Sequence, residues 1–221
     1  MALTGIKAEE VNASLRSIQN SYNELMRALV TDMNNQFVNE IANLWVCKEA
    51  VDFFNGDYTT TCNSMKKAVN ETFRSIFDAM NGAAATYAAN DGTSGGSYTR
   101  VEFSEDTANV NVGTIKENEG GLRGADVEGI KSTTESKLGT ILGTIQGALS
   151  KTETSVETSG FYDAESSQAN ALRTSISTIK NSIEKNFEQI KEALVEQANA
   201  TSQKFGDIKS KIASETFNIN E

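Results

Sequence analysis

Apolar side chains recur along residues 8–44 at intervals of three or four positions. The intervals are 4, 3, 4, 3, 4, 4, 4, 4 and 3, through Val11, Leu15, Ile18, Tyr22, Leu25, Leu29, Met33, Phe37, Ile41 and Leu44. This spacing places all of them on one stripe of an α-helix and predicts a helix of about 55 Å. Because a single stripe of this length needs a partner to bury it, we expect an antiparallel helix beside it.

The next segment repeats the pattern to about residue 90. Its apolar positions are Val51, Phe54, Tyr58, Cys62, Met65, Val69, Phe73, Ile76, Phe77, Met80 and Tyr87. A connection as short as residues 45–48 predicts an antiparallel helical hairpin. The stretch Asn55-Gly56-Asp57 is a poor helix former, so we expect a local irregularity near the start of the second helix.

Residues 92–126 differ from the rest, since they are rich in Gly, Ser, Asn and Asp and lack a helical period. Within them, residues 98–103 and 109–113 alternate between apolar and polar side chains, as short strands do. Two interpretations remain open. The segment either contains a small β-hairpin or is a flexible linker.

A second pair of helices follows. One is predicted from about residue 126 to 158, and an interruption at 159–165 separates it from the last helix. The last helix has a heptad pattern, through Leu172, Ile176, Ile179, Ile183, Phe187, Ile190, Leu194, Ala198, Thr201, Phe205, Ile208 and Ile212. The sequence therefore predicts an all-α protein with a first hairpin at 1–91, a linker at 92–126 and a second hairpin at 127–221. The two hairpins would form a four-helix bundle.

The two halves also match in order and register. A shift of 118 residues places Phe54 on Leu172 and Tyr58 on Ile176, among other pairs. Each half has a helix, a break with an aromatic residue, and a second helix. In the second half the break contains Gly160 and Phe161. We interpret the chain as an internal duplication.

Three glycines lie four residues apart in the third helix, at Gly139, Gly143 and Gly147. Each costs a helix interior about 0.8–1 kcal/mol relative to alanine. Close packing against another helix would offset that cost, and we predict it here. A membrane dimer is a poorer interpretation, because the uncharged window at 138–150 is too short to span a bilayer.

The charge and residue composition of the chain disfavour several classes of function. The chain has 221 residues, of which 20 are Lys or Arg and 30 are Asp or Glu, so its net charge is -10. Such a charge disfavours nucleic acid and anionic membranes as partners. Histidine is absent, which removes the commonest general base and metal ligand. Glu184, Glu188 and Glu192 alternate with lysines and indicate a solvated face. We therefore predict no enzyme activity, cofactor or metal site.

Two cysteines, Cys47 and Cys62, are 15 residues apart. On a continuous helix they would be separated by about 22 Å, whereas a disulfide needs Cα atoms within about 7 Å. We expect two free thiols. The first residues, MALTGIKAEEV, lack the pattern of a secretory signal peptide, and no apolar run reaches the ~18 residues of a membrane span.

The break at Trp45-Val46-Cys47 holds the only tryptophan, and Tyr87-Ala-Ala-Asn-Asp91 follows where the first hairpin ends. A helix, a Trp-x-Gly turn, a second helix and a Tyr-x-x-x-Asp element resemble the WXG superfamily of type VII secretion proteins. The match departs from the family pattern at Cys47, where glycine belongs. The second break, at Gly160 and Phe161, has an aromatic residue but no tryptophan.

The resemblance implies a non-enzymatic protein that is secreted without a cleaved N-terminal signal peptide. It implies a secretion signal at Trp45, Cys47, Tyr87 and Asp91, recognised by the type VII secretion ATPase or another protein partner. Family members are hairpins of about half this length that pair with a second hairpin. Because this chain supplies both hairpins, we expect a monomeric bundle.

Other interpretations of the same residues remain open. Trp45 can simply close the apolar seam, with its ring packed and its indole N–H in water, while Tyr87 belongs to the core. The heptads of the last helix also fit a structural coiled-coil subunit of a phage or surface filament. A helical pore-forming or membrane-active module is a further alternative, based on the glycines of the third helix and the linker.

Overall fold

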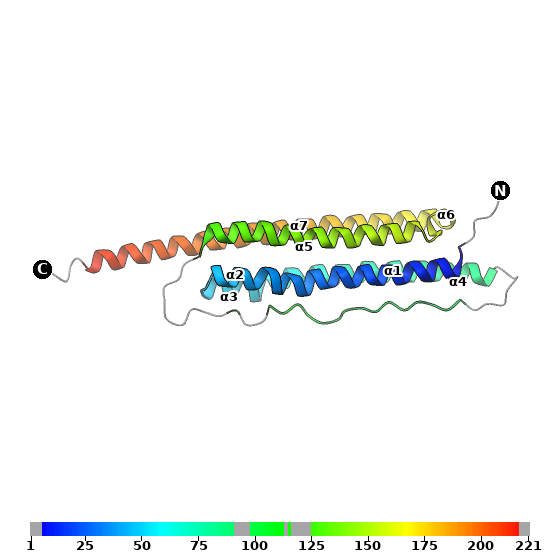
Figure 1. Ribbon diagram of the computed structural model, residues 1–221, viewed down its shortest axis with the longest axis horizontal. Helices are drawn as coiled ribbons and strands as arrows, with labels where there is room; N and C mark the ends of the chain where they lie inside the picture. The colour runs from blue at the N-terminus through cyan, green and yellow to red at the C-terminus, as the bar shows by residue number, and fades with distance from the viewer. Residues whose placement is uncertain (1–5, 91–97, 113–114, 116–124, 217–221) are drawn as a thin grey trace. The chain divides into compact units, whose positions relative to one another are not determined.

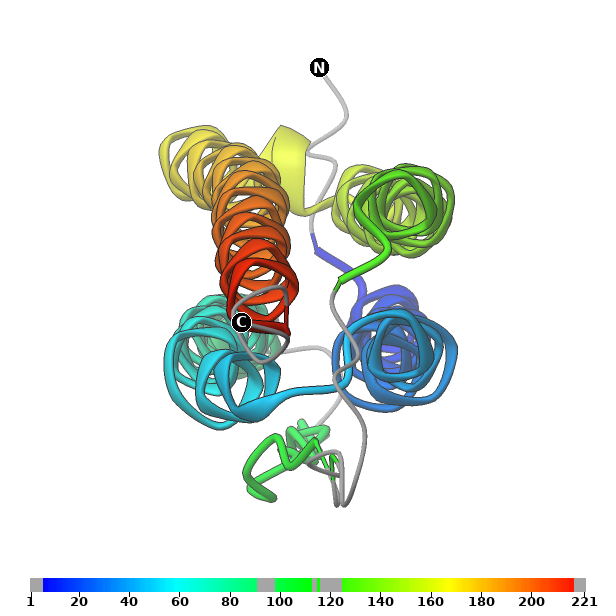
Figure 2. The same cartoon turned by 90° about the vertical axis from the view of Figure 1, so that its left-hand side faces the viewer.

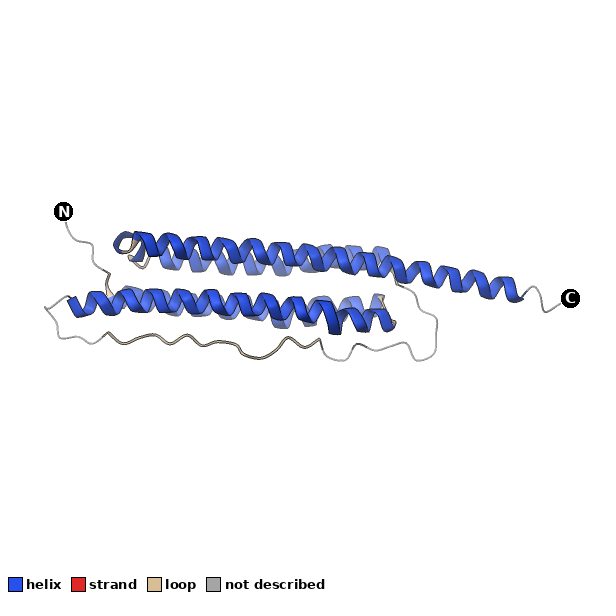
Figure 3. Ribbon diagram, turned by 180° about the vertical axis from the view of Figure 1, so that it is seen from behind, coloured by secondary structure: helices blue, strands red, loops and turns tan. Residues whose placement is uncertain are grey.

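The structure is a computed structural model that describes residues 6–90, 98–112, 115 and 125–216 (Figure 1). The described part is helical apart from its connecting segments and contains no strand (Figure 3). The predicted all-α class is confirmed.

The first predicted helix has the predicted limits but not a uniform geometry. It consists of α1 (Ala8–Met26), a π-helical stretch η1 (Arg27–Val38) and α2 (Asn39–Leu44). The π-helical stretch coincides with the run of four-residue steps from Leu25 to Ile41. Four residues of an α-helix exceed one turn, so repeated steps of four drift around the axis. The wider π turns reduce this drift, and Leu29, Met33 and Phe37 all remain buried.

The second predicted helix begins with the expected irregularity. It consists of α3 (Lys48–Phe53), a second π-helical stretch η2 (Phe54–Tyr58) and α4 (Thr59–Asn90). The π turn includes Asn55-Gly56-Asp57. Its widened end is bridged by the Thr59 hydroxyl, which donates a hydrogen bond of 2.6 Å to the carbonyl of Phe54, five residues earlier. The prediction of a local irregularity is confirmed.

The second half contains α5 (Val127–Glu157), the short α6 (Phe161–Ala164) and α7 (Ser166–Thr216). The predicted interruption at 159–165 is confirmed as the turn between α5 and α7. Gly160 adopts a φ of 74°, the one left-handed backbone conformation among the described residues. Glycine adopts this conformation without steric cost, which explains its place at the turn.

The helices are divided between two compact units. Unit 1 comprises Met1–Leu29, Ser64–Asn109 and Leu142–Glu184, and unit 2 comprises Val30–Asn63, Val110–Ile141 and Lys185–Glu221. Each unit therefore contains parts of both predicted hairpins. The predicted division at 1–91, 92–126 and 127–221 follows the order of the chain and does not coincide with these units.

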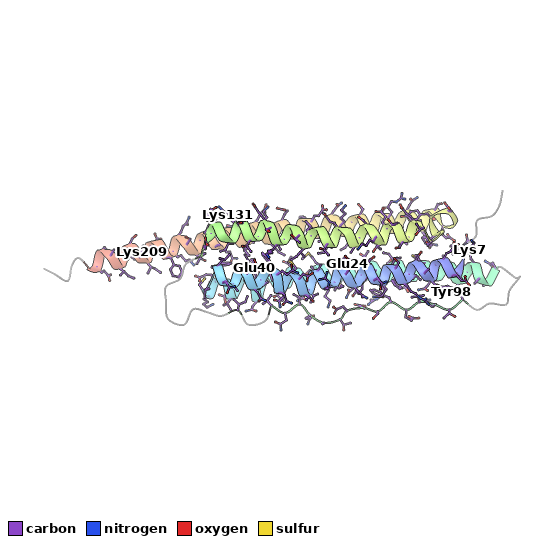
Figure 4. All side chains as sticks on the ribbon, in the orientation of Figure 1. Lys7, Glu24, Glu40, Tyr98, Lys131 and Lys209 are labelled. Carbon is purple, nitrogen blue, oxygen red and sulfur yellow. The ribbon has the colours of Figure 1, made fainter. Side chains whose placement is uncertain are left out.

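Unit 1 packs α1, α6 and segments of α4, α5 and α7 around an apolar core. Tyr22 of α1 contacts Phe73 of α4, with ring centroids 5.3 Å apart. Lys151 of α5 pairs with Glu24 of α1 at 2.7 Å (Glu24 is labelled in Figure 4). Gln146 of α5 donates a hydrogen bond to Glu184 of α7.

Unit 2 contains α2, α3 and η2 together with segments of η1, α4, α5 and α7. Phe37 of η1 faces Tyr58 of η2, with ring centroids 6.1 Å apart. Lys137 of α5 pairs with Glu40 at 2.7 Å.

The β-hairpin considered for residues 92–126 is not present in the described part of that segment. Residues 98–109, here called the strap, run in an extended conformation along α1 and α4 of unit 1 (Figure 1). Figure 2 looks along the helices and shows the strap, drawn in green, beside them. The strap forms no ladder because helix side chains bind its backbone instead. Asn81 both donates to the Val101 carbonyl and accepts from the Val101 N–H, at 3.0 and 3.1 Å.

Candidate functional site

The turn between α2 and α3 is the candidate site. Trp45 has φ -137° and ψ 90°, and Cys47 has φ -163° and ψ 174°, so both residues are extended. Any L-residue adopts such angles. The turn therefore does not require glycine at position 47, which is why a cysteine fits where the Trp-x-Gly pattern has glycine.

The backbone of the turn is held by the residues that precede α5. The N–H of Asp126 donates a hydrogen bond of 3.0 Å to the carbonyl of Leu44, and Trp45 forms an isolated antiparallel bridge with Ala125. This contact fixes the start of α5 against the end of α2.

The side chain of Trp45 is fully buried, with 0% of its surface exposed. Its indole N–H donates a hydrogen bond of 3.3 Å to the hydroxyl oxygen of Thr201 on α7. The Thr201 hydroxyl donates in turn to the carbonyl of Gln197 at 2.9 Å. The ring is packed, as expected for a residue that closes the apolar seam. The expectation of an indole N–H in water is wrong, because Thr201 supplies its acceptor.

An aromatic cluster surrounds the indole. The centroids of Phe53 and Phe54 lie 6.0 and 6.4 Å from that of Trp45, and Phe54 lies 5.2 Å from Tyr58. Tilted and edge-on pairs of this kind stabilise a core beyond the burial of their area. The turn is thus anchored on both sides, by aromatic rings from α3 and η2 and by a hydroxyl from α7.

The two cysteines are free and buried, as predicted. Burial raises the pKa of the Cys47 thiol, and it raises the pKa of the Cys62 thiol to about 12. Both thiols are therefore protonated at neutral pH and are poor nucleophiles. The pKa of Glu49 is lowered by hydrogen bonds from its own backbone N–H and from the Cys47 thiol, with a smaller contribution from Lys204.

The predicted secretion-signal residues are not gathered in one unit. Trp45 and Cys47 belong to unit 2, whereas Tyr87 lies on α4 in unit 1, partly exposed. Asp91 lies outside the described residues. The Tyr98 hydroxyl donates a hydrogen bond of 2.7 Å to Asn81 at the start of the strap (Tyr98 is labelled in Figure 4).

The turn of the second half resembles the first in its buried aromatic side chain. Phe161 is fully buried, and Gly160 precedes it in the left-handed conformation. Phe161 lies in unit 1, where the hydroxyl of Ser159 accepts a hydrogen bond from its backbone N–H.

The prediction of close helix packing at Gly139, Gly143 and Gly147 is wrong. All three glycines are exposed, and a Cβ atom at each of them would meet nothing within 4 Å. The buried face of α5 is instead formed by larger residues such as Leu138, Ile141 and Ile145. The helix therefore carries the cost of these glycines without a packing gain in this structure.

Replacement of Gly143 by alanine is expected to raise the free energy of unfolding by about 0.8–1 kcal/mol. The added methyl group meets open space, so the change acts through helix propensity alone. Urea unfolding followed by circular dichroism would measure the gain. A loss of stability would instead show that this face packs against something.

The strap is a feature that the sequence analysis missed. The Tyr22 hydroxyl accepts a hydrogen bond from the Asp106 N–H at 2.7 Å and donates one to Asn70 at 2.9 Å. Lys66 is almost fully buried, and its ammonium group pairs with the Asp106 carboxylate at 2.9 Å and with the Ala108 carbonyl. Arg74 pairs with Glu105. The strap is thus bound by a buried polar network.

A signal for this strap was present in the sequence. Asn63, Asn70 and Asn81 are spaced by 7 and 11 residues, which places them on one face of α4. Asn12 and Gln19 share the same spacing of 7 on α1. The strap is bound by Asn12, Gln19, Asn70 and Asn81, and Asn63 accepts from the N–H of Val110 just beyond it. A stripe of amides can satisfy an extended backbone, since each amide both donates and accepts.

A groove between α1 and α5 in unit 1 is lined by hydroxyls such as Ser17 and Ser155, and its charged groups Glu24 and Lys151 neutralise each other. No group of three or more potential metal ligands occurs in the described part of the chain. Nor does any described helix have the length and apolar character required to cross a membrane.

Comparison with known proteins finds no family model, curated protein or solved structure that matches the chain.

Proposed function

We propose that the chain is a non-enzymatic helical protein of WXG type, exported by a type VII secretion system without a cleaved N-terminal signal peptide. It acts as a substrate or partner of that system through protein–protein interaction. In this proposal the four long helices form one monomeric four-helix bundle, with the second hairpin in place of the partner hairpin that other family members recruit.

The observation that carries the proposal is the way Trp45 is held. The only tryptophan of the chain lies in the turn between α2 and α3, and its indole is buried between aromatic rings and Thr201 of α7. A buried indole N–H needs an acceptor, and here that acceptor comes from the second half of the chain. This contact joins the Trp-x-Cys turn to the last helix.

The burial of Trp45 also indicates which residues of the turn a secretion ATPase could recognise. The indole itself is not accessible, whereas Lys48 is exposed and Val46 and Glu49 are partly exposed. We infer that Trp45 acts by fixing the shape of this surface. Tyr87 and Asp91 would form a second contact at the end of α4.

Export is the test. Wild type, Trp45→Ala, Tyr87→Ala and Phe161→Ala would be expressed in a host with an active type VII system, and culture supernatants would be blotted against a lysis control. We expect the wild type in the supernatant and both signal variants in the cells. Phe161→Ala removes an equally buried aromatic residue from the other turn and should still be exported, provided that it folds.

Circular dichroism of each purified variant separates a lost signal from a lost fold. Retention of the wild type inside cells whose secretion system exports a known substrate would refute the proposal. Equal retention of folded Phe161→Ala and Trp45→Ala would show that export depends on bundle integrity and not on the Trp45 turn.

A further inference from the structure

The last turns of α7 carry an apolar stripe that leaves the core of unit 2. Up to Ala198 and Thr201 the stripe is buried. Beyond Thr201, in the segment 202–215 that we call the α7 end, no residue is buried. Ile208 and Ile212 are 41% and 51% exposed, and they are the two large apolar side chains exposed in the described part of the chain. Figure 1 shows this segment extending past α3 and the first turn of α5.

The stripe keeps its register where it becomes exposed. Thr201, Phe205, Ile208 and Ile212 continue the four–three steps of the buried part of α7. In a heptad, these residues occupy the core positions that pack against another helix. The α7 end therefore continues an established helix–helix interface, and the surface that fits it is a further helix.

Lysines flank this stripe on both sides. Lys204 and Lys211 occupy the g positions of the heptad and Lys209 an e position, while Asp207 lies at a c position on the outer side (Lys209 is labelled in Figure 4). Lys204 already pairs with Glu49 at 3.3 Å. The core stripe is thus bordered by positive charge in a chain whose net charge is -10.

We propose that the α7 end binds an acidic amphipathic helix of another protein. The apolar face of that helix would cover Phe205, Ile208 and Ile212, and its carboxylates would lie opposite the flanking lysines. Residues at e and g positions set the choice of partner in paired helices. The proposal does not depend on export, because it rests on register, exposure and charge alone.

A second copy of the chain is a poor occupant. In a parallel pair the g lysines would face the e lysine, and in an antiparallel pair each set would face its own kind. Like charges in these positions repel. An anionic membrane is also a poor occupant, since the stripe is only about three turns long and the acidic chain is repelled by the surface.

Fluorescence anisotropy with the full chain tests the proposal. One labelled synthetic helix has leucine and isoleucine at its core positions and glutamate at its e and g positions, and a matched helix has lysine at e and g. We expect the glutamate peptide to bind and the lysine peptide not to bind. Ile208→Ala and Ile212→Ala should each weaken binding about tenfold, the ratio that corresponds to the burial of one aliphatic side chain.

Two variants make the test specific. Gln203→Ala lies on the outer face of the same helix and should bind the glutamate peptide as the wild type does. The double variant Lys209→Glu with Lys211→Glu should reverse the preference, so that the lysine peptide binds. Both changes are at exposed positions, and circular dichroism would confirm that the fold is retained.

Three results would overturn the proposal. One is an absence of binding, or equal binding of the two peptides. Another is a dimer in analytical ultracentrifugation that Ile208→Ala dissociates, which would make a second copy the occupant. The third is cosedimentation with vesicles rich in phosphatidylserine that Ile208→Ala abolishes, which would make a lipid surface the occupant.

Discussion

Replacement of Trp45 by alanine is expected to lower the free energy of unfolding by about 3–5 kcal/mol. The side chain is fully buried at a turn that carries contacts from α3, η2 and α7, so little of the surrounding structure is free to fill the cavity. The change also leaves the Thr201 hydroxyl without its donor. Urea unfolding followed by circular dichroism would measure the loss.

Two matched variants separate the loss of the packed ring from the loss of the hydrogen bond between the Trp45 indole and Thr201. Trp45→Phe keeps an aromatic ring and loses the indole N–H, so it should cost less than alanine. Thr201→Val keeps the volume at position 201 and leaves the buried indole N–H without an acceptor, which costs about 1–3 kcal/mol. A cost below about 1 kcal/mol for Trp45→Ala would contradict the packing described for this turn.

The same measurements bear on export. If Trp45→Ala lowers stability as expected but still folds at the temperature of expression, its secretion phenotype reports on the signal. Thr201→Val weakens the same turn from the other helix without changing the Trp-x-Cys sequence. Its export would show whether the secretion system reads the residues of the turn or the geometry that α7 imposes on it.

The helix limits follow from the sequence because periodicity is a local property. The apolar steps from Val11 to Leu44 predicted the first helical segment at 8–44, and the poor helix formers at Asn55-Gly56-Asp57 marked the irregular turn. The π-helical stretch η1 was not predicted, although its signal was the run of four-residue steps. A run of that kind is compatible with an α-helix and becomes diagnostic only when the buried face is known.

The conformation of the strap and the position of the α5 glycines depend on tertiary contacts, so local sequence patterns do not determine them. Whether residues 98–109 pair with each other or with helix side chains depends on which amides face them, and this is a tertiary property. The cost of three glycines in a helix predicts close packing on their face of α5. The buried stripe of α5 passes through Leu138, Ile141 and Ile145, and the glycines lie on the other side.

Removal of the Asp106 carboxylate is expected to release the strap. Asp106→Ala should lower the free energy of unfolding by about 2–3 kcal/mol, because it leaves the buried ammonium group of Lys66 with a single neutral acceptor, the Ala108 carbonyl. The estimate stays below the cost of breaking a fully buried pair, since the Asp106 side chain is 38% exposed while that of Lys66 is 5% exposed. Hydrogen exchange at the Val101 and Ser104 amides, which bond to Asn81 and Gln19, would report the release directly.

A double variant separates two contributions to this cost. One is the loss of the ion pair between Lys66 and Asp106, and the other is the burial of an unpaired Lys66 ammonium group. Lys66→Met with Asp106→Ala removes both partners and keeps an apolar side chain of similar length at position 66. If the cost arises from an unpaired buried ammonium group, the double variant should be more stable than Asp106→Ala alone. If the two are equally unstable, the strap is held by the pair itself.

The pH dependence follows from the same pair. Partial burial raises the pKa of Asp106. Hydrogen bonds from the Lys66 ammonium group and the Ala108 N–H, together with the positive charge of Lys66, lower it by more. The net effect is a pKa below the ordinary value. A carboxylate with a lowered folded-state pKa contributes stability that is present above about pH 4 and is lost as the pH falls through that lowered pKa. Asp106→Asn keeps an oxygen acceptor for Lys66 and removes the titration. It should therefore unfold with a weaker dependence on pH below about 4 than the wild type, and an unchanged slope would exclude Asp106 as a source of the acid sensitivity of the strap.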